Sequence, residues 1–257
     1  MLAILSPAKT LDFESDLPEV DATDPVFLRE ADGIADRLAE MNREQLGELM
    51  SISENLADLN YQRYQDWEKN AGDDAARPAL FTYAGDVYDG LDAGQFDADD
   101  IDYAQQSLRV LSGLYGVVRP KDRIQAYRLE MKTAINPGDS DSLAGYWRPK
   151  VTGQLNQDLA AGDHAALVNL ASTEYFKAVD TDELARPVID VQFKEESDGK
   201  KRVIAIYAKR ARGMMARYMV KNRVDTTHAL KDFNEADYAF DADLSDEQSL
   251  VFSRPKP

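Results

Sequence analysis

The sequence predicts an α+β or irregular mixed α/β fold, built as a single domain over residues 1–257 with an embedded helix–hairpin–helix-like segment. Short apolar runs typical of strands recur along the whole chain and mix with helical periodicity, without forming regular βαβ units. No Pro/Gly/Ser-rich linker interrupts the chain. Its 257 residues, with 44% hydrophobic side chains, are enough to bury one sizeable core.

The first hundred residues are expected to hold one buried strand followed by several helices. Apolar side chains from Phe27 to Met41 recur every three or four residues, which is the helical period. Asn42 is placed to cap a second helix with Gln45 as its capping-box partner, and Ser53 is placed to cap a third. The expected elements are a strand at 2–6, helices over 27–41 and after Asn42 and Ser53, a strand at 79–85, and a turn with exposed acidic side chains at 85–91.

The rest of the chain is expected to continue with helices and strands in mixed order. Asp99 or Asp100 can cap a helix whose apolar period runs on to Leu111, and Gly113 follows in the right place for a left-handed stop. The later elements are a helical segment from 142 broken near Pro149, strands at 166–171, 188–193 and 202–208, a helix over 209–223, and two short strands near the end.

Residues 111–131, LSGLYGVVRPKDRIQAYRLEM, resemble a helix–hairpin–helix layout. Gly113 and Gly116 follow one helix, and Pro120 suits the first turn of another. In that layout the hairpin amides contact a DNA phosphate without reading base sequence. The alternative is an ordinary turn into a strand, with the basic side chains paired to the acidic first hundred residues. The basic side chains around the hairpin are Arg109, Arg119, Lys121, Arg123 and Arg128.

Charge is unevenly distributed in this acidic chain, whose formal net charge is -17. Residues 1–107 carry 7 basic and 25 acidic side chains, whereas residues 108–223 carry 20 basic and 14 acidic ones. The overall charge favours solubility and disfavours indiscriminate binding to polyanions. The basic middle indicates either one local anion-binding surface or internal neutralisation of the acidic ends.

The chemistry available to the chain is limited by its composition. It contains no cysteine, so disulfides, thiolate catalysis and iron–sulfur ligation are excluded. Its two histidines, His164 and His228, are far apart, and no metal site and no cofactor are expected. No apolar run is long enough to cross a membrane, and the amino end lacks the features of a signal peptide, so a cytoplasmic location is expected.

Two segments have the composition of anion-binding sites. SPAKT supplies Ser6, Lys9 and Thr10 directly after a buried strand, where amides, hydroxyls and an ammonium group suit a phosphate. In the helix expected over 209–223, Arg210, Arg217 and Lys221 fall on one stripe beside an apolar face. Each segment also has a plain structural interpretation, namely a strand exit with a surface lysine and a solvated helix face.

Several long motifs together resemble the YaaA peroxide-stress protein family. They are SPAKTLDF, GDVYDGL, LSGLYGVVRPKDRIQAYRLEM, VNLASTEYFKAV and YAKRARGMMARYMVKNR, and they extend from the amino end to about Phe240. The resemblance implies a cytoplasmic bacterial protein of the hydrogen-peroxide response that limits damage from unincorporated iron. It also implies binding of double-stranded or structured DNA by a helix–hairpin–helix on a mixed α/β fold.

The resemblance assigns anion-binding roles to named residues and leaves two functions open. It adds Lys209, Arg210 and Arg212 of the basic helix to the hairpin residues and to Lys9 and Thr10. The first function is stress-related DNA binding. The second is an enzyme acting on a nucleotide or another phosphorylated small molecule, with SPAKT, Lys177 and Lys209 around a cleft. A deep pocket where the motifs converge would favour the enzyme, and a long open basic groove would favour the DNA-binding protein.

Overall fold

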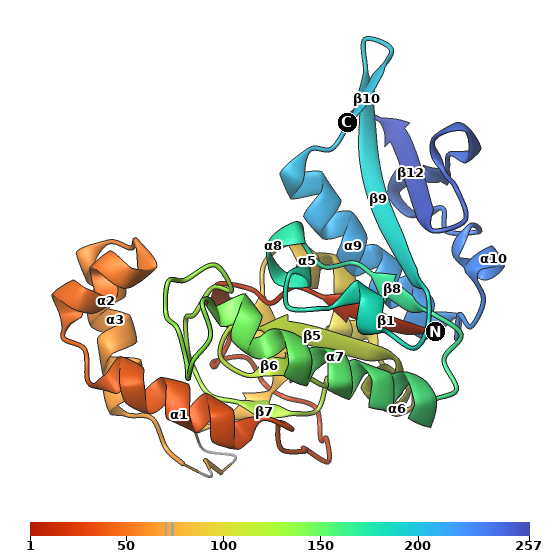
Figure 1. Cartoon of the computed structure of the whole chain (residues 1–257). Coiled ribbons are helices and arrows are strands. Elements are labelled where there is room, and N and C mark those ends of the chain that lie inside the picture. The colour runs from red at the N-terminus through yellow and green to blue at the C-terminus, as the bar shows by residue number, and fades with distance from the viewer. Residues whose placement is uncertain (70, 73–74) are drawn as a thin grey trace.

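The fold is centred on one mixed sheet, seen in a computed structural model that describes residues 1–69, 71–72 and 75–257 (Figure 1). The strand order in the main path of this eight-stranded sheet is β11-β12-β9-β8-β1-β5-β6, and β10 pairs with β9 alone. The strands are β1 (Leu2–Leu5), β2 (Thr10–Leu11), β3 (Arg77–Pro78), β4 (Tyr83–Ala84), β5 (Leu108–Ser112), β6 (Gly116–Val118), β7 (Arg123–Ile124), β8 (Leu167–Asn169), β9 (Val188–Ser197), β10 (Lys200–Arg202), β11 (Ala239–Phe240) and β12 (Ser249–Pro255).

Helices surround this sheet and also form a separate arm. They are α1 (Leu28–Ala39), α2 (Arg43–Met50), α3 (Glu54–Gln65), α4 (Ala79–Thr82), α5 (Asp86–Leu91), α6 (Ala98–Ser107), α7 (Leu143–Ala161), α8 (Thr173–Phe176), α9 (Ala205–Lys221) and α10 (Thr227–Leu230). In Figure 1, α7 passes in front of β5 and β6, whereas α1, α2 and α3 extend to the left of the sheet. The β9–β10 hairpin projects from the top of the molecule in the same view, so the molecule has two arms.

The centre of the sheet is parallel. β12, β9, β8, β1 and β5 run in the same direction, whereas β6, β10 and β11 pair antiparallel at its margins. All four side chains of β1 are fully buried, because the strand has a parallel neighbour on each side and is covered on both faces. Strands of this kind have continuous apolar sequences, as LAIL does.

Several expectations for the first hundred residues are confirmed, and two are wrong. The capping box of Asn42 and Gln45 is present at the start of α2, and Ser53 precedes α3. Residues 79–85 are mostly the short helix α4, and 86–91, expected to be an exposed turn, form α5 with Tyr88 and Leu91 buried. Both segments are too short for periodicity to distinguish a helix from a strand or turn.

The helix–hairpin–helix expectation is wrong. The helix begins after Asp97, which forms a capping box with Asp100, and α6 ends at Ser107 rather than at Gly113. Residues 108–112 are the buried strand β5, which pairs antiparallel with β6. The segment is therefore a β-hairpin. The expectation of a helix failed because the apolar run of β5 continues the helical period of α6 by coincidence.

Two further boundaries differ from expectation in the second half. Pro149 lies inside the continuous helix α7 and does not break it. Residues 205–208 belong to α9 rather than to a strand, and β10 covers only 200–202. Asp198 and Gly199, both with positive φ, make the tight turn between β9 and β10. The mixed α/β class itself is confirmed, with a mainly parallel sheet.

Candidate functional site

The candidate site lies where the parallel strands β1, β5 and β8 end. β1 has β5 on one side and β8 on the other, so the chain moves to one side of β1 and later returns to pair on its other side. Crevices at such switch points are where open parallel sheets commonly bind ligands. Three polar residues gather at this edge, with Ser6 after β1, Ser112 at the end of β5 and Ser172 three residues after β8.

Hydrogen bonds join the SPAKT loop to the segments beside it. The amide of Ser172 donates to Ser6 Oγ at 2.8 Å, and the two hydroxyl oxygens lie 3.2 Å apart. Tyr88 of α5 donates from its phenol to the carbonyl oxygen of Ser6 at 3.0 Å. The loop is therefore held by α5 and by the start of α8, elements that are distant from it in sequence.

Buried phenols form the floor below this loop. The hydroxyl of Tyr127 lies 2.7 Å from both the hydroxyl of Tyr83 and Ser112 Oγ. Burial raises the pKa of Tyr127 to about 12, although its bonds to Ser112 and Tyr83 act in the opposite direction. The phenol is thus neutral at physiological pH and serves as a hydrogen-bonding group of fixed protonation.

A cationic cluster surrounds one carboxylate at the rim. Glu130, with 11% of its side chain exposed, pairs with Lys9 at 3.0 Å, Arg128 at 3.1 Å and Lys132 at 3.2 Å. Burial alone would raise the pKa of Glu130, but the hydrogen bonds from Lys9 and Lys132 outweigh it and the pKa is lowered. Three cations around one anion leave a local positive surplus. Glu174 lies nearby, where its carboxylate accepts a hydrogen bond from the amide of Lys132.

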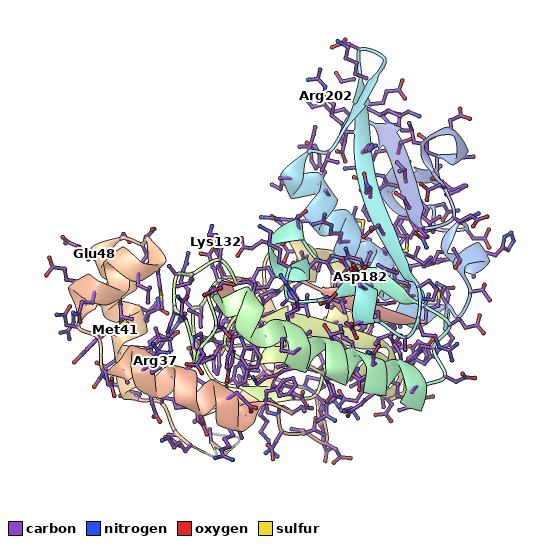
Figure 2. The ribbon with its side chains drawn as sticks, in the orientation of Figure 1. Arg37, Met41, Glu48, Lys132, Asp182 and Arg202 are labelled. Carbon is purple, nitrogen blue, oxygen red and sulfur yellow. The ribbon has the colours of Figure 1, made fainter. Side chains whose placement is uncertain are left out.

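The pocket within this cluster is very small. Its volume is about 10 Å³, which is room for one water molecule. Lys9 and Lys132 remain 59% and 66% exposed beside it, so an anion could contact them from outside. Figure 2 shows Lys132 between the two arms of the molecule. The lining residues are Pro7, Ala8, Lys9, Tyr127, Arg128, Leu129, Glu130 and Tyr175.

The hairpin arginines do not face an external anion. Arg109 is 5% exposed, and its guanidinium donates to Asp158 at 2.7 Å and to the carbonyl oxygens of Gln105 and Leu108. Arg119 pairs with the buried Asp122 at 2.9 Å. The expected phosphate contact of Arg109 is therefore contradicted, because its donors are occupied inside the protein.

Gly113 and Gly116 have packing roles in the β-hairpin. A Cβ atom on Gly113 would overlap the carbonyl oxygen of Leu129. Gly116 has φ of 68°, and a Cβ there would lie 2.5 Å from the Trp147 ring. The amides of the two residues between the glycines donate to Ser112 Oγ and are not free to bind a phosphate.

The expected basic stripe of α9 is mostly neutralised. Arg217 pairs with Glu235 at 2.5 Å, and Lys221 pairs with Asp100 at 2.5 Å. Lys209 lies 3.9 Å from a carboxylate oxygen of Asp86. Arg212 is partly buried, and burial lowers the pKa of its guanidinium. Thr10, expected with Lys9 at an anion site, is exposed in β2.

Four exposed cations at the carboxyl edge of the sheet have no carboxylate partner within 4 Å among the described residues. We call this set the unpaired cations. Two of them are on β10, which pairs with the end of β9, one follows α8, and one is in the first half of α9. Figure 2 shows Arg202 at the base of the projecting hairpin. The set is Lys177, Lys200, Arg202 and Arg210.

Sequence reasoning found part of this edge and missed the rest. Ser6, Lys9, Arg128, Lys177 and Arg210 were expected to bind anions, and they do lie at this edge. The missed residues are Ser112, Tyr127, Glu130, Lys132, Ser172, Lys200 and Arg202. Only one sequence signal pointed to them, the run of lysines and arginine at 200–202 after an Asp-Gly turn.

The described part of the chain offers no metal cluster and no membrane helix. It contains no group of three or more His, Asp or Glu side chains arranged to hold a metal ion. No helix within it combines the length and apolar character that a bilayer crossing needs.

Comparison with known proteins gives a consistent result over nearly the whole chain. Residues 1–244 match the family model described as peroxide stress protein YaaA. A UPF0246 protein of Flavobacterium johnsoniae is 47% identical over 254 residues, which cover 99% of this chain and all of the relative. UPF0246 proteins of Idiomarina loihiensis and Burkholderia pseudomallei are 44% and 45% identical, with 99% of this chain and 98% of each relative covered.

Proposed function

This chain belongs to the peroxide stress protein YaaA family, and from that premise we propose that it is a cytoplasmic protein that limits iron-dependent damage by binding DNA phosphates. The unpaired cations carry the proposal. The chain has 47 acidic side chains for 30 basic ones, so a group of exposed cations without carboxylate partners at one edge is unexpected on charge alone. Their position at the open edge of the sheet suits contact with an external polyanion.

Phosphate contacts made by lysine and arginine side chains position a protein on DNA without reading base sequence. Binding of this kind releases the counterions condensed on the duplex. Ferrous ions are among the cations that the phosphates attract. A protein that replaces them along the backbone would move the site of radical formation away from the DNA, which connects DNA binding with protection from peroxide.

Salt dependence tests this function. The slope of log K against log salt changes by about 0.9 for each phosphate contact. Replacing Lys200, Arg202 and Arg210 with glutamine should therefore flatten the slope by about 2.7 units on duplexes of any sequence. Fluorescence anisotropy at several salt concentrations measures this slope.

The matched control removes the same charge from cations that already have partners. Arg43, Lys69 and Arg186 pair with Asp58, Asp36 and Asp163 at the surface. Their triple glutamine variant should keep the slope of the unmodified protein. Equal slopes in the two triple variants would contradict the proposed interface, because long-range charge alone would then explain the binding.

The convergence of three sequence motifs at the switch point favours a second candidate function. This function is the binding or conversion of a phosphorylated small molecule. Ser6, Lys9, Glu130 and Tyr175 come together there from three sequence motifs. Under this function, ADP or inorganic phosphate should raise the melting temperature, and Lys9→Gln should abolish the increase. Under DNA binding alone, neither anion stabilises the protein at millimolar concentration.

A further inference from the structure

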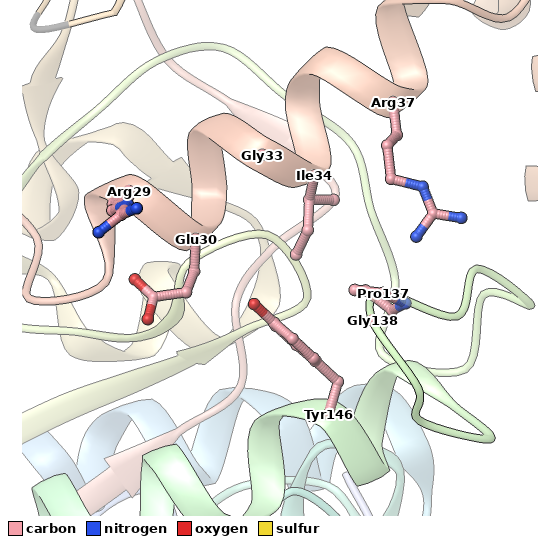
Figure 3. Close-up of a pocket in the computed structure, with 8 residues that line it drawn as sticks. All are labelled: Arg29, Glu30, Gly33, Ile34, Arg37, Pro137, Gly138 and Tyr146. Atoms are coloured by element: carbon pink, nitrogen blue, oxygen red, sulfur yellow. The ribbon is translucent and has the colours of Figure 1, made fainter.

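We propose that the groove between α1 and α7 is a second ligand site, which takes a small elongated molecule with an anionic group at one end. Figure 3 shows side chains from α1 and α7 facing each other across it, with the 137–138 loop closing one end. Its volume of about 360 Å³ suits a small molecule. The residues that the argument uses are Arg29, Glu30, Gly33, Arg37, Gly138 and Tyr146.

The two ends of the groove carry different side chains, because Arg37 lies at one end whereas Arg29 and Glu30 lie together at the other. Arg29 and Arg37 are eight residues apart on one helix, about 12 Å along its axis. Arg37 has no carboxylate within 4 Å among the described residues, and one of its nitrogens donates to the carbonyl oxygen of Asn136 at 2.8 Å. Its remaining donors and the Gly138 turn make this end the place for an anion.

The other end, beside Arg29, also offers hydrogen-bond acceptors. Glu30 lines it together with Tyr146, whose pKa is raised by burial and by the nearby Glu30 carboxylate. Figure 3 shows the phenol of Tyr146 pointing toward α1 between Glu30 and Ile34. The phenol has no hydrogen-bond partner within the described residues. A ligand with a hydroxyl or amino group opposite its anionic end would complement both the Glu30 carboxylate and the Tyr146 phenol.

Gly33 provides an independent observation. It lies in the interior of α1, where glycine destabilises a helix relative to alanine. A Cβ at this position would meet nothing within 4 Å, so packing inside the protein does not require glycine. Close approach of a ligand to the helix backbone would account for a glycine here. The glycine is on the groove wall, where the middle of an elongated ligand would lie.

The test combines binding with stability in the full-length protein. Phenyl phosphate, an anion with a flat apolar body, is titrated while the amide signals of Gly33 and Gly138 are followed by NMR. Both signals should shift, and Arg37→Gln should weaken binding about tenfold because a charge-assisted hydrogen bond is lost. Inorganic phosphate should bind more weakly than phenyl phosphate, since it lacks the body that contacts Gly33.

Gly33→Ala distinguishes a ligand site from a structural role. It should raise the melting temperature by about 2 °C and also weaken phenyl phosphate binding. Gly153→Ala is the matched control, because Gly153 lies inside α7 with nothing within 4 Å of its Cβ and does not line the groove. It should raise the melting temperature and leave binding unchanged. Absence of amide shifts, or equal affinity in Gly33→Ala and the unmodified protein, overturns the proposal.

Discussion

Arg109 and Asp158 form an ion pair inside the protein, with only 6% and 12% of their side chains exposed. Removing one partner of such a pair leaves the other charge buried without compensation. We expect Arg109→Met to lower the free energy of unfolding by about 3–5 kcal/mol. Urea unfolding of the variant measures this loss.

The double variant Arg109→Met/Asp158→Leu is the control. It removes both charges and should recover much of the lost stability, because no buried charge then remains unpaired. If Arg109→Met alone were as stable as the unmodified protein, the guanidinium would not be buried in solution. Its expected role in phosphate contact would then need to be tested again.

His164 couples stability to pH. It is 8% exposed, its Nε2 lies 3.2 Å from the carbonyl oxygen of Gln106, and burial lowers its pKa below 6.5. The unfolded chain therefore takes up a proton at this histidine before the folded protein does. The stabilisation is complete above pH 6.5 and is lost as the pH falls toward the folded-state pKa.

The unfolding free energy measured from pH 5 to 7.5 tests this coupling. Between the two pKa values the contribution of His164 changes by at most about 1.4 kcal/mol per pH unit. His164→Gln should remove that part of the pH dependence. Parallel pH profiles for the variant and the unmodified protein would show that the histidine titrates normally when folded.

At the residue scale, the sequence predicted the local setting of a residue better than its interaction partners in the fold. Ser6 and Lys9 were recognised because a strand exit with these residue types is visible within five positions. Arg109 was misassigned because Asp158, its partner, is 49 positions away. Counting charges along the chain shows how many cations exist but does not show which of them the fold neutralises.

The contact between α5 and α9 depends on two glycines. A Cβ on Gly213 would overlap the carbonyl oxygen of Val87, and one on Gly90 would overlap that of Arg210. The two helix backbones therefore pack directly against each other. We expect Gly213→Ala to lower the free energy of unfolding by about 2–3 kcal/mol, because neither backbone can move without disturbing the core.

Gly153→Ala in α7 provides the comparison for chemical or thermal unfolding. Its Cβ would meet nothing within 4 Å, so the same substitution should stabilise the protein by about 0.5–1 kcal/mol. Opposite signs for two helical Gly→Ala substitutions would confirm that the α5–α9 contact requires glycine. A neutral or stabilising Gly213→Ala would mean that the helices are farther apart.

At the element scale, the long helices and the short buried strands β1 and β8 were predicted, whereas the short helices α4 and α5 were not. α1 and α2 have a clear period or cap in sequence. α5 has only six residues and is stabilised by its contact with α9, which local sequence does not contain. β5 was mistaken for helix because a short, fully buried apolar run has the same pattern in either structure.

For the whole molecule, net charge should make stability rise with salt. A charge of -17 destabilises the compact state through self-repulsion, and raising the salt from 0.01 to 0.1 M shortens the screening length from about 30 to about 10 Å. We expect the free energy of unfolding to increase over this range while DNA affinity decreases. Unfolding and anisotropy experiments in the same buffers measure both, and a parallel decrease would contradict the expectation.

The sequence predicted a mixed α/β molecule but not its mainly parallel centre. Parallel pairing joins β1 to strands that begin at positions 108 and 167, and no local pattern indicates which distant strand will be the neighbour. The gathering of SPAKT with Tyr127–Glu130 and Ser172 depends on this pairing. The residue types at the site were therefore visible before their grouping was.

The central position of β1 also affects how the protein is made. The ribosome produces Leu2–Leu5 long before the strand's two neighbours, β5 and β8, because these lie far downstream in the chain. Until then its four apolar side chains have no sheet to enter, and both of its edges lack hydrogen-bond partners. The nascent chain thus carries an exposed, aggregation-prone strand until β5 and β8 have been made, and a chaperone that shields apolar segments would bind it there.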